Sequence, residues 1–208
     1  MKICLVTNAI YDPVPEYVQY TNALKQLYCD SWGIEYLFTS ENPLPHLHPQ
    51  WCKTTFMLKA LEEYDWAVWI DCDAATVGMD FDLGRFLSTV GDKVVMAKDI
   101  NGWNSGVLAI SNKERSMKWL NHIHSLRDEP KYRNGWREQQ AMSDSFCLDW
   151  SGIEFLPPKE IGWNSYLDIY GRTEPNLYEH GHWVLHIPGV IDEIRDRIFG
   201  NGEWIAKK

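Results

Sequence analysis

Short apolar runs alternate with amphipathic stretches along the first part of the chain. Residues 2–8, 34–40 and 66–70 are apolar runs with the length of buried strands. Between them, residues 15–32 and 51–64 place apolar side chains at the spacing of one helix face. This alternation predicts a parallel sheet with right-handed crossovers, in which ligands bind beyond the carboxyl ends of the strands.

The second part of the chain has a less regular order of elements. Its pattern predicts a helix at 81–88, a strand at 93–99, a glycine-broken turn into a strand at 101–111, helices at 113–126 and 135–147, and short strands at 153–158 and 182–189. No linker or low-complexity tract divides the chain. We therefore expect one α/β domain over residues 1–208, with a Rossmann-like, mainly parallel central sheet flanked by helices and a small mixed C-terminal sheet.

Composition narrows the class of protein. A net charge of −9 argues against nucleic acid as a partner, because affinity for nucleic acid comes largely from neutralising phosphates. The five cysteines are scattered and lack metal-site spacing, which indicates reduced thiols and a cytoplasmic location. No run approaches the roughly 18 apolar residues of a membrane span. We therefore expect a globular protein without a membrane span.

Aromatic residues are unusually frequent. The chain has eleven Trp and ten Tyr, and several stand beside Asn, His or Asp, as in "NGWNSG", "EIGWNSY" and "EHGHW". Aromatic faces beside amides and carboxylates suit sugar rings, whose C–H faces stack while their hydroxyls form hydrogen bonds. Packing in the core and loops is the equally valid alternative for any single Trp.

Two aspartates follow the strand at 66–70. Alternation along an extended chain returns every second side chain to the same face, so Asp71 and Asp73 can converge while Cys72 points away. Two carboxylates at one point favour a divalent cation, and hard oxygen ligands suit Mg²⁺, Mn²⁺ or Ca²⁺. The alternative is a pair of aspartates that caps a turn.

Sequence motifs between about residue 51 and residue 189 resemble those of a known enzyme family. "YDWAVWIDCDAATV", "VVMAKDINGWNSGVLAIS", "WREQQAM" and "HIPG" stand in the order found in nucleotide-sugar glycosyltransferases of the GT-A fold. The chain most resembles the family of fungal Golgi galactosyl- and mannosyltransferases and xyloglucan xylosyltransferases. The resemblance implies that Asp71, Asp73 and His186 hold Mn²⁺ or Mg²⁺ on the donor diphosphate. His180 and His182 are rivals for the imidazole ligand.

The resemblance also implies the remaining site residues. The expected catalytic group is Gln139, Glu138 and Asp99. The expected donor-binding residues within the resemblance are Lys53, Asp71, Asn104, Gly106 and Gly189. Thr7, Asn8 and Tyr11 are added because they follow the first strand, where they would face the nucleotide base and Tyr11 could stack on it. Residues 1 to about 110 would then bind the nucleotide, and residues from about 111 to 208 the acceptor.

Each of these roles has a plainer alternative. The Asn-Gly pair at 101–102 predicts a hairpin turn in its own right. Lys53 is either a partner of the donor or a solvated lysine, and the helix that carries Glu138 and Gln139 is otherwise an ordinary polar surface helix. After Gly189 the chain reads "VIDEIRDR", which leaves the donor phosphates to the metal, Lys53 and Arg195.

The expected function is transfer of a sugar from a nucleoside diphosphate sugar to a hydroxyl, on a glycan or another acceptor. UDP is the first choice of nucleotide and GDP the second. The neutral amide of Gln139 is a poor base, which favours retention of anomeric configuration. The alternatives are a non-catalytic sugar- or nucleotide-binding module of the same fold, a nucleotidyltransferase that makes sugar donors, and a phage-type enzyme that glycosylates DNA bases. "TNAIYDPVPE" lacks the glycine-rich basic loop of the nucleotidyltransferase, and the acidic charge argues against the DNA-modifying enzyme.

Overall fold

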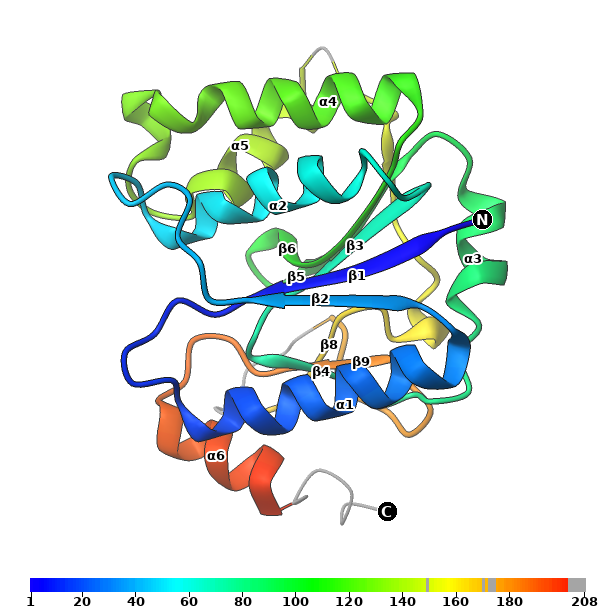
Figure 1. Ribbon diagram of the computed structural model, residues 1–208, viewed down its shortest axis with the longest axis vertical. Coiled ribbons are helices and arrows are strands. Elements are labelled where there is room, and N and C mark those ends of the chain that lie inside the picture. Colours follow the sequence, from blue (N-terminus) through cyan, green and yellow to red (C-terminus); the bar gives the residue numbers. More distant parts are fainter. Residues whose placement is uncertain (149, 170, 172–174, 202–208) are drawn as a thin grey trace.

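A six-stranded sheet forms the centre of the protein (Figure 1). The computed structural model describes residues 1–148, 150–169, 171 and 175–201. In spatial order the strands are β2 (Glu35–Thr39), β1 (Ile3–Asn8), β3 (Trp66–Ile70), β6 (Gly102–Ser111), β5 (Val94–Asp99) and β7 (Glu154–Phe155). Only β6 runs antiparallel to its neighbours, so five of the six strands of this sheet share one direction. The expected mainly parallel sheet is confirmed.

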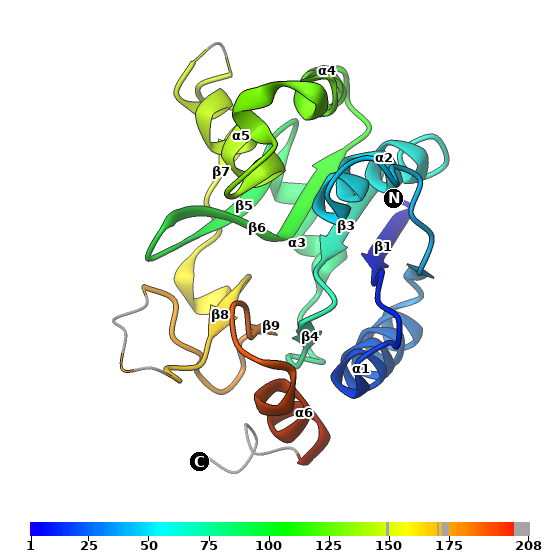
Figure 2. The same ribbon diagram turned by 90° about the vertical axis from the view of Figure 1, so that its left-hand side faces the viewer.

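Helices and a second sheet cover the two faces of the central sheet (Figures 1 and 2). One face carries α2 (Cys52–Ala60), α4 (Glu114–Ser125) and α5 (Arg137–Phe146). The other carries α1 (Glu16–Trp32), α3 (Leu83–Val90) and the small sheet, and α6 (Asp192–Asn201) packs against α1. Short 3₁₀ turns connect these elements: η1 (Pro49–Trp51), η2 (Leu126–Asp128), η3 (Pro130–Tyr132) and η4 (Lys159–Ile161).

The core divides according to the alternation of side chains along the strands. Along β1, Cys4 and Val6 pack into the cluster beneath α2, α4 and α5, whereas Ile3 and Leu5 pack into the cluster on the opposite face. All six residues of β1 are buried, as expected for a strand covered on both faces. Among the described residues, no helix has the length and apolar character needed to span a membrane.

The small sheet contains β4 (Ala74–Thr76), β9 (Val184–His186) and β8 (Ser165–Tyr166). It is mixed as expected, since β4 is antiparallel to β9 and β8 is parallel to it. Its first strand comes from the N-terminal part of the chain, which the sequence pattern did not indicate. The chain turns at Asp71–Asp73, and Ala74 then pairs with His186. This pairing brings the late histidine beside the two aspartates.

Candidate active site

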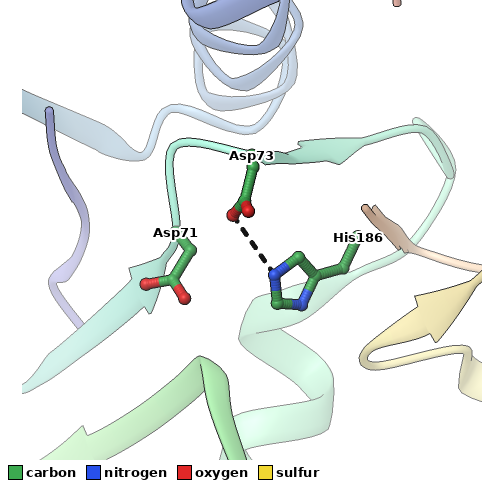
Figure 3. Close-up of side chains that lie close together, drawn as sticks. All are labelled: Asp71, Asp73 and His186. Carbon is green, nitrogen blue, oxygen red and sulfur yellow. Dashed lines mark ion pairs between the residues drawn. The ribbon is translucent and has the colours of Figure 1, made fainter. Parts of the chain in front are cut away.

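Asp71, Asp73 and His186 come together where the two sheets meet. One ligand atom from each of the three side chains lies within 4.8 Å of the others, and the side chains face a common space (Figure 3). His186 Nε2 is 3.2 Å from Asp73 Oδ1. Two carboxylates and one imidazole form a donor set that suits Mn²⁺ or Mg²⁺ completed by further oxygen ligands. The rival His182 instead contacts the Ser165 hydroxyl through its Nδ1, at 2.8 Å.

Asp73 lies between two basic side chains. Arg195 Nη2 donates to Asp73 Oδ2 at 3.0 Å, on the carboxylate oxygen opposite the one that faces His186. Burial raises the pKa of Asp73, but His186 and Arg195 outweigh that effect and lower the pKa to about 2. The carboxylate is therefore ionised over the whole physiological range, as a metal ligand must be.

The imidazole of His186 is oriented by an asparagine that sequence reasoning missed. His186 Nδ1 lies 2.9 Å from Asn164 Oδ1, and Asn164 Nδ2 donates to Asn104 Oδ1 at 2.9 Å. Because the Asn164 oxygen accepts, Nδ1 carries a proton, which leaves Nε2 as the nitrogen that would bind a cation when the imidazole is neutral. The tetrapeptide Gly-Trp-Asn-Ser occurs at 102–105 and again at 162–165, and this repeat is the signal that could have identified Asn164.

Gly106 lies directly against His186. A β-carbon at this position would overlap the imidazole ring, so the glycine makes room for the histidine. The backbone N–H of Gly106 donates to Asn104 Oδ1, and its carbonyl accepts from Asp71 N, both at 2.8 Å. These contacts explain a glycine at this position within the protein itself, and its role toward the donor remains a prediction.

Helix α1 supports the aspartate turn from behind. Lys25 Nζ donates to the Asp71 carbonyl at 2.9 Å, and Thr21 Oγ1 donates to the Cys72 carbonyl at 2.7 Å. Lys25 is fully buried, and burial lowers its pKa to about 8. Sequence reasoning missed both residues. Their only signal is that they fall on the inward face of the predicted helix, in helical register with Tyr17.

Lys53 is buried among acidic and polar groups, so the solvated alternative is wrong. Its Nζ is 3.2 Å from Glu138 Oε1 and 3.4 Å from Asp71 Oδ1, and it donates to the Ser105 carbonyl at 2.8 Å. Burial lowers the pKa of Lys53, but Asp71 and Glu138 outweigh that effect and raise it. Burial also raises the pKa of Glu138, against the opposing effect of Lys53. The second carboxylate oxygen of Glu138 is buried without a hydrogen-bond partner.

Gln139 and Asp99 both make hydrogen bonds within the protein. Gln139 Oε1 accepts from the Ser105 N–H at 2.9 Å, which sets the orientation of the side-chain amide. Asp99 accepts from the Asn104 side chain at 2.8 Å and from the Asn101 N–H at 2.6 Å. These contacts hold both residues in fixed positions and leave further lone pairs on their oxygens.

Two cavities share the aspartates as a common wall. The first, of about 470 Å³, is lined by Asp71, Asp73, Asp99, Asn104, Glu138, Gln139, His186, Gly189 and Arg195, among others. The second, of about 370 Å³, is lined by Asn8, Tyr11, Gln50, Lys53, Trp69, Asp71, Asp73 and others. Gln50 lines both cavities and is a further residue that sequence reasoning missed.

Thr7 departs from the expectation that it faces the nucleotide. Its side chain is fully buried, and its hydroxyl donates to the Ile70 carbonyl at 2.8 Å. Thr7 therefore ties the end of β1 to the end of β3. Asn8 and Tyr11 do line the second cavity, and Tyr11 is 44% exposed.

Solved structures share this fold. No family model and no curated protein sequence matches the chain. A glycosyltransferase involved in glycosylation of the major capsid of PBCV-1 superposes with a TM-score of 0.78 at 17% identity, over 97% of this chain and 100% of that one. The glycosyltransferase GlyE of Streptococcus pneumoniae gives a TM-score of 0.60 at 15% identity, over 100% of this chain and 64% of that one.

A third neighbour is the galactosyltransferase LgtC in complex with donor and acceptor sugar analogs, with a TM-score of 0.55 at 14% identity over the whole of both chains. At these identities the comparisons establish the fold, which is that of GT-A glycosyltransferases. The likeness to the fungal Golgi and xyloglucan enzymes rests on the sequence motifs alone.

Proposed function

We propose that this protein is a metal-dependent glycosyltransferase that moves a sugar from a nucleoside diphosphate sugar to an acceptor hydroxyl. The observation that carries the proposal is the group of Asp71, Asp73 and His186, whose two aspartates line both cavities. A donor that spans both cavities would place its diphosphate at this common wall. The fold shared with glycosyltransferases supports the same function.

The residues at the common wall fit a divalent cation bound to a diphosphate. Asp71, Asp73 and His186 would hold Mn²⁺ or Mg²⁺, which would stabilise the negative charge on the departing diphosphate as a Lewis acid. Arg195 is already 3.0 Å from Asp73, so its remaining guanidinium N–H groups are close to where the phosphates would lie. Lys53 has its charge committed to Asp71 and Glu138, and we assign it to holding those carboxylates rather than the phosphates.

The second cavity is assigned to the nucleotide and the first to the donor sugar. Tyr11 offers an exposed aromatic face for the base, and UDP remains the first choice with GDP second. In the first cavity the unpartnered oxygen of Glu138 would accept a hydrogen bond from a sugar hydroxyl, with Asp99 and Asn104 nearby. Trp136 lines the same cavity and is 48% exposed, so it offers a face to an acceptor sugar.

Transfer with retention of configuration follows from the chemistry of Gln139. A carboxamide is too weak a base to deprotonate the acceptor from the face opposite the leaving group. The departing diphosphate would instead take the acceptor proton on its own face. The Gln139 carbonyl accepts from the Ser105 N–H, and its second lone pair would ease positive charge on the anomeric carbon when the Ser105 hydroxyl donates to Glu138 rather than to Gln139.

The test is a screen of nucleotide sugars for Mn²⁺-stimulated hydrolysis. Asp73→Asn should abolish the stimulation, because it removes one of the two convergent charges that hold the cation. Asp80→Asn, the same change at an exposed aspartate, is the matched control. Hydrolysis by Asp73→Asn at the wild-type rate would refute the assignment. Mn²⁺-dependent nucleotide binding without turnover of any donor would instead indicate the non-catalytic module.

A further inference from the structure

A third, smaller cavity lies beside the donor site. It measures about 220 Å³ and lies between the loop before α2 and the connection from α4 to α5. This cavity is called the basic recess, and its lining includes His46, His48, Trp51, Arg127, Asp128 and Arg133. His48 also lines the second cavity, so the recess adjoins the donor site. The loop that forms one wall is proline-rich, and none of the contacts assigned to the donor uses His46 or His48.

The recess has a positive charge in an acidic protein. The chain has a net charge of −9, yet the recess contains two arginines and one aspartate. Arg127 Nε is 3.6 Å from the Asp128 carboxylate, so these two charges offset one another. Arg133 donates only to the Asp128 backbone carbonyl, at 3.3 Å, and has no carboxylate partner among the described residues. Arg133 is exposed, and its charge is therefore available to an acidic ligand.

Arg137 provides an independent observation at the edge of the recess. Its Nη1 donates to Gln50 Oε1 at 3.1 Å and to the Gly135 carbonyl at 2.7 Å. Its Nε is buried without a hydrogen-bond partner, and within the described residues Arg137 has no ion pair. Buried polar groups are nearly always satisfied, so the Nε of Arg137 leaves a donor available to a further acceptor, either water or an anionic ligand.

The backbone and position of Arg137 support the same conclusion. Its φ is 46°, in the left-handed region that is strained for a non-glycine residue and recurs at ligand sites. Gln50, which it contacts, lines both donor cavities. The backbone N–H of Gln50 also donates to His48 Nδ1 at 3.3 Å, so Gln50 connects Arg137 to the histidine shared by the recess and the donor site. Burial and the charge of Arg137 lower the pKa of His48, which agrees with this placement. Arg137 therefore contacts a residue of the donor cavities, Gln50, that is itself hydrogen-bonded to the recess residue His48.

We propose that the acceptor substrate carries an acidic group, a carboxylate or a phosphate, that binds to Arg133 and Arg137 at the basic recess. This rests on the proposed glycosyltransferase function and names its acceptor class. Guanidinium groups match the planar geometry of carboxylates and the oxygens of phosphates. An acidic sugar would provide an anionic acceptor for Arg137 and a counterion for Arg133, which a neutral sugar would not.

Binding of small probes tests the proposal without requiring turnover. The probes are p-nitrophenyl β-glucuronide, glucose 6-phosphate and the neutral p-nitrophenyl β-glucoside, titrated calorimetrically into protein saturated with Mn²⁺ and the best nucleotide. A charge-assisted hydrogen bond contributes about 1.5–3 kcal/mol, so at least one acidic probe should bind about 10- to 100-fold more tightly than the glucoside. Preference for the glucuronide alone identifies a carboxylate, and preference for the phosphate alone identifies a phosphate group.

Three matched variants test which arginines cause the preference for acidic probes. Arg133→Gln and Arg137→Gln should lose the preference, whereas Arg85→Gln, the same change at an exposed position on α3, should keep it. Arg133 is itself exposed, so its variant remains informative if Arg137→Gln fails to fold. Equal affinity of the wild type for all three probes would overturn the proposal. So would a preference that persists in both recess variants, or one that is lost in Arg85→Gln as well.

Donor hydrolysis in the absence of acceptor separates this proposal from the broader one. A wild-type protein that hydrolyses donor but binds the three probes equally would remain a glycosyltransferase without an acidic acceptor. With any acceptor that is found, the recess variants should lower the ratio of transfer to hydrolysis. An unchanged ratio in both variants would count against the recess as an acceptor site.

Discussion

The hydrogen bond between Asn164 and His186 allows a quantitative test of how the metal site is assembled. Asn164→Ala removes the acceptor of His186 Nδ1 and the donor to Asn104 Oδ1, both at 2.9 Å. His186 is 2% exposed and Asn164 is 1% exposed, so water cannot easily replace the lost partner. A buried polar group left unsatisfied costs about 1–3 kcal/mol in the free energy of unfolding.

The larger consequence concerns the metal. Outer partners of a metal-binding histidine typically contribute about 10- to 100-fold in metal affinity, because they fix the tautomer and the orientation of the ring. We therefore expect Asn164→Ala to raise the Mn²⁺ dissociation constant about 10- to 100-fold, which corresponds to about 1.4–2.7 kcal/mol. Calorimetric titration with Mn²⁺ at saturating nucleotide measures this change, and urea unfolding in chelator measures stability separately.

Asn121→Ala is the control for this experiment. Asn121 is an exposed asparagine on α4 whose amide donates to the Met117 carbonyl at 2.8 Å, so the variant removes the same side chain far from the site. It should leave the Mn²⁺ affinity unchanged. If Asn164→Ala loses stability but binds Mn²⁺ with wild-type affinity, Asn164 only fills the core and the argument that it orients His186 is refuted.

Three further predictions address neighbouring features of the site. Gly106→Ala should displace the His186 ring and lower Mn²⁺-stimulated turnover at least about tenfold while the circular dichroism spectrum stays native; full activity would contradict the packing argument. In metal-free protein the pKa of Lys25 is lowered to about 8, whereas that of an unfolded lysine is about 10.4. Between these two pH values the unfolded chain binds more protons than the folded one, so the stability of the wild type should rise across this interval relative to Lys25→Met. Urea unfolding at both ends of the interval checks this, and parallel curves for the two proteins would exclude it. Gln139→Ala should lower turnover roughly ten- to a thousandfold with little effect on donor binding, and NMR of the first product from an α-linked donor should find an α linkage, whereas a β linkage would overturn retention.

The central sheet could be predicted because each of its long strands coincides with a local run of apolar residues. Residues 66–70 form an unbroken apolar run, and all five are buried in β3. The convergence of Asp71 and Asp73 is equally local, since it depends on two residues at the end of one strand. The strands β4 and β8 have only three and two residues, too few for any periodic pattern, and their existence depends on pairing with the distant β9.

The buried lysines mark the limit of sequence reasoning at the site. A lysine in an amphipathic helix ordinarily reaches solvent, and the sequence of α1 or α2 alone gives no reason to bury Lys25 or Lys53. The buried charge of Lys53 is compensated by Glu138, which comes from another helix much later in the chain. The buried ammonium group of Lys25 donates a hydrogen bond to the Asp71 carbonyl, at the turn between the two sheets. Partners of this kind are set by tertiary structure and have no local pattern.

One chain of polar contacts connects Asp99 to the proposed metal ligands. Asp99 accepts from Asn104, Asn104 accepts from Asn164, Asn164 contacts His186, and His186 contacts Asp73, with every step between 2.8 and 3.2 Å. Asn104 and Asn164 use both ends of their amides, so neither can rotate without leaving a buried group unpaired. Asp99 and Asp73 are therefore held at a fixed separation across two sheets. The proposed transfer from a sugar diphosphate would use this constraint, because the donor sugar and its phosphates would have to be placed by groups that do not move independently.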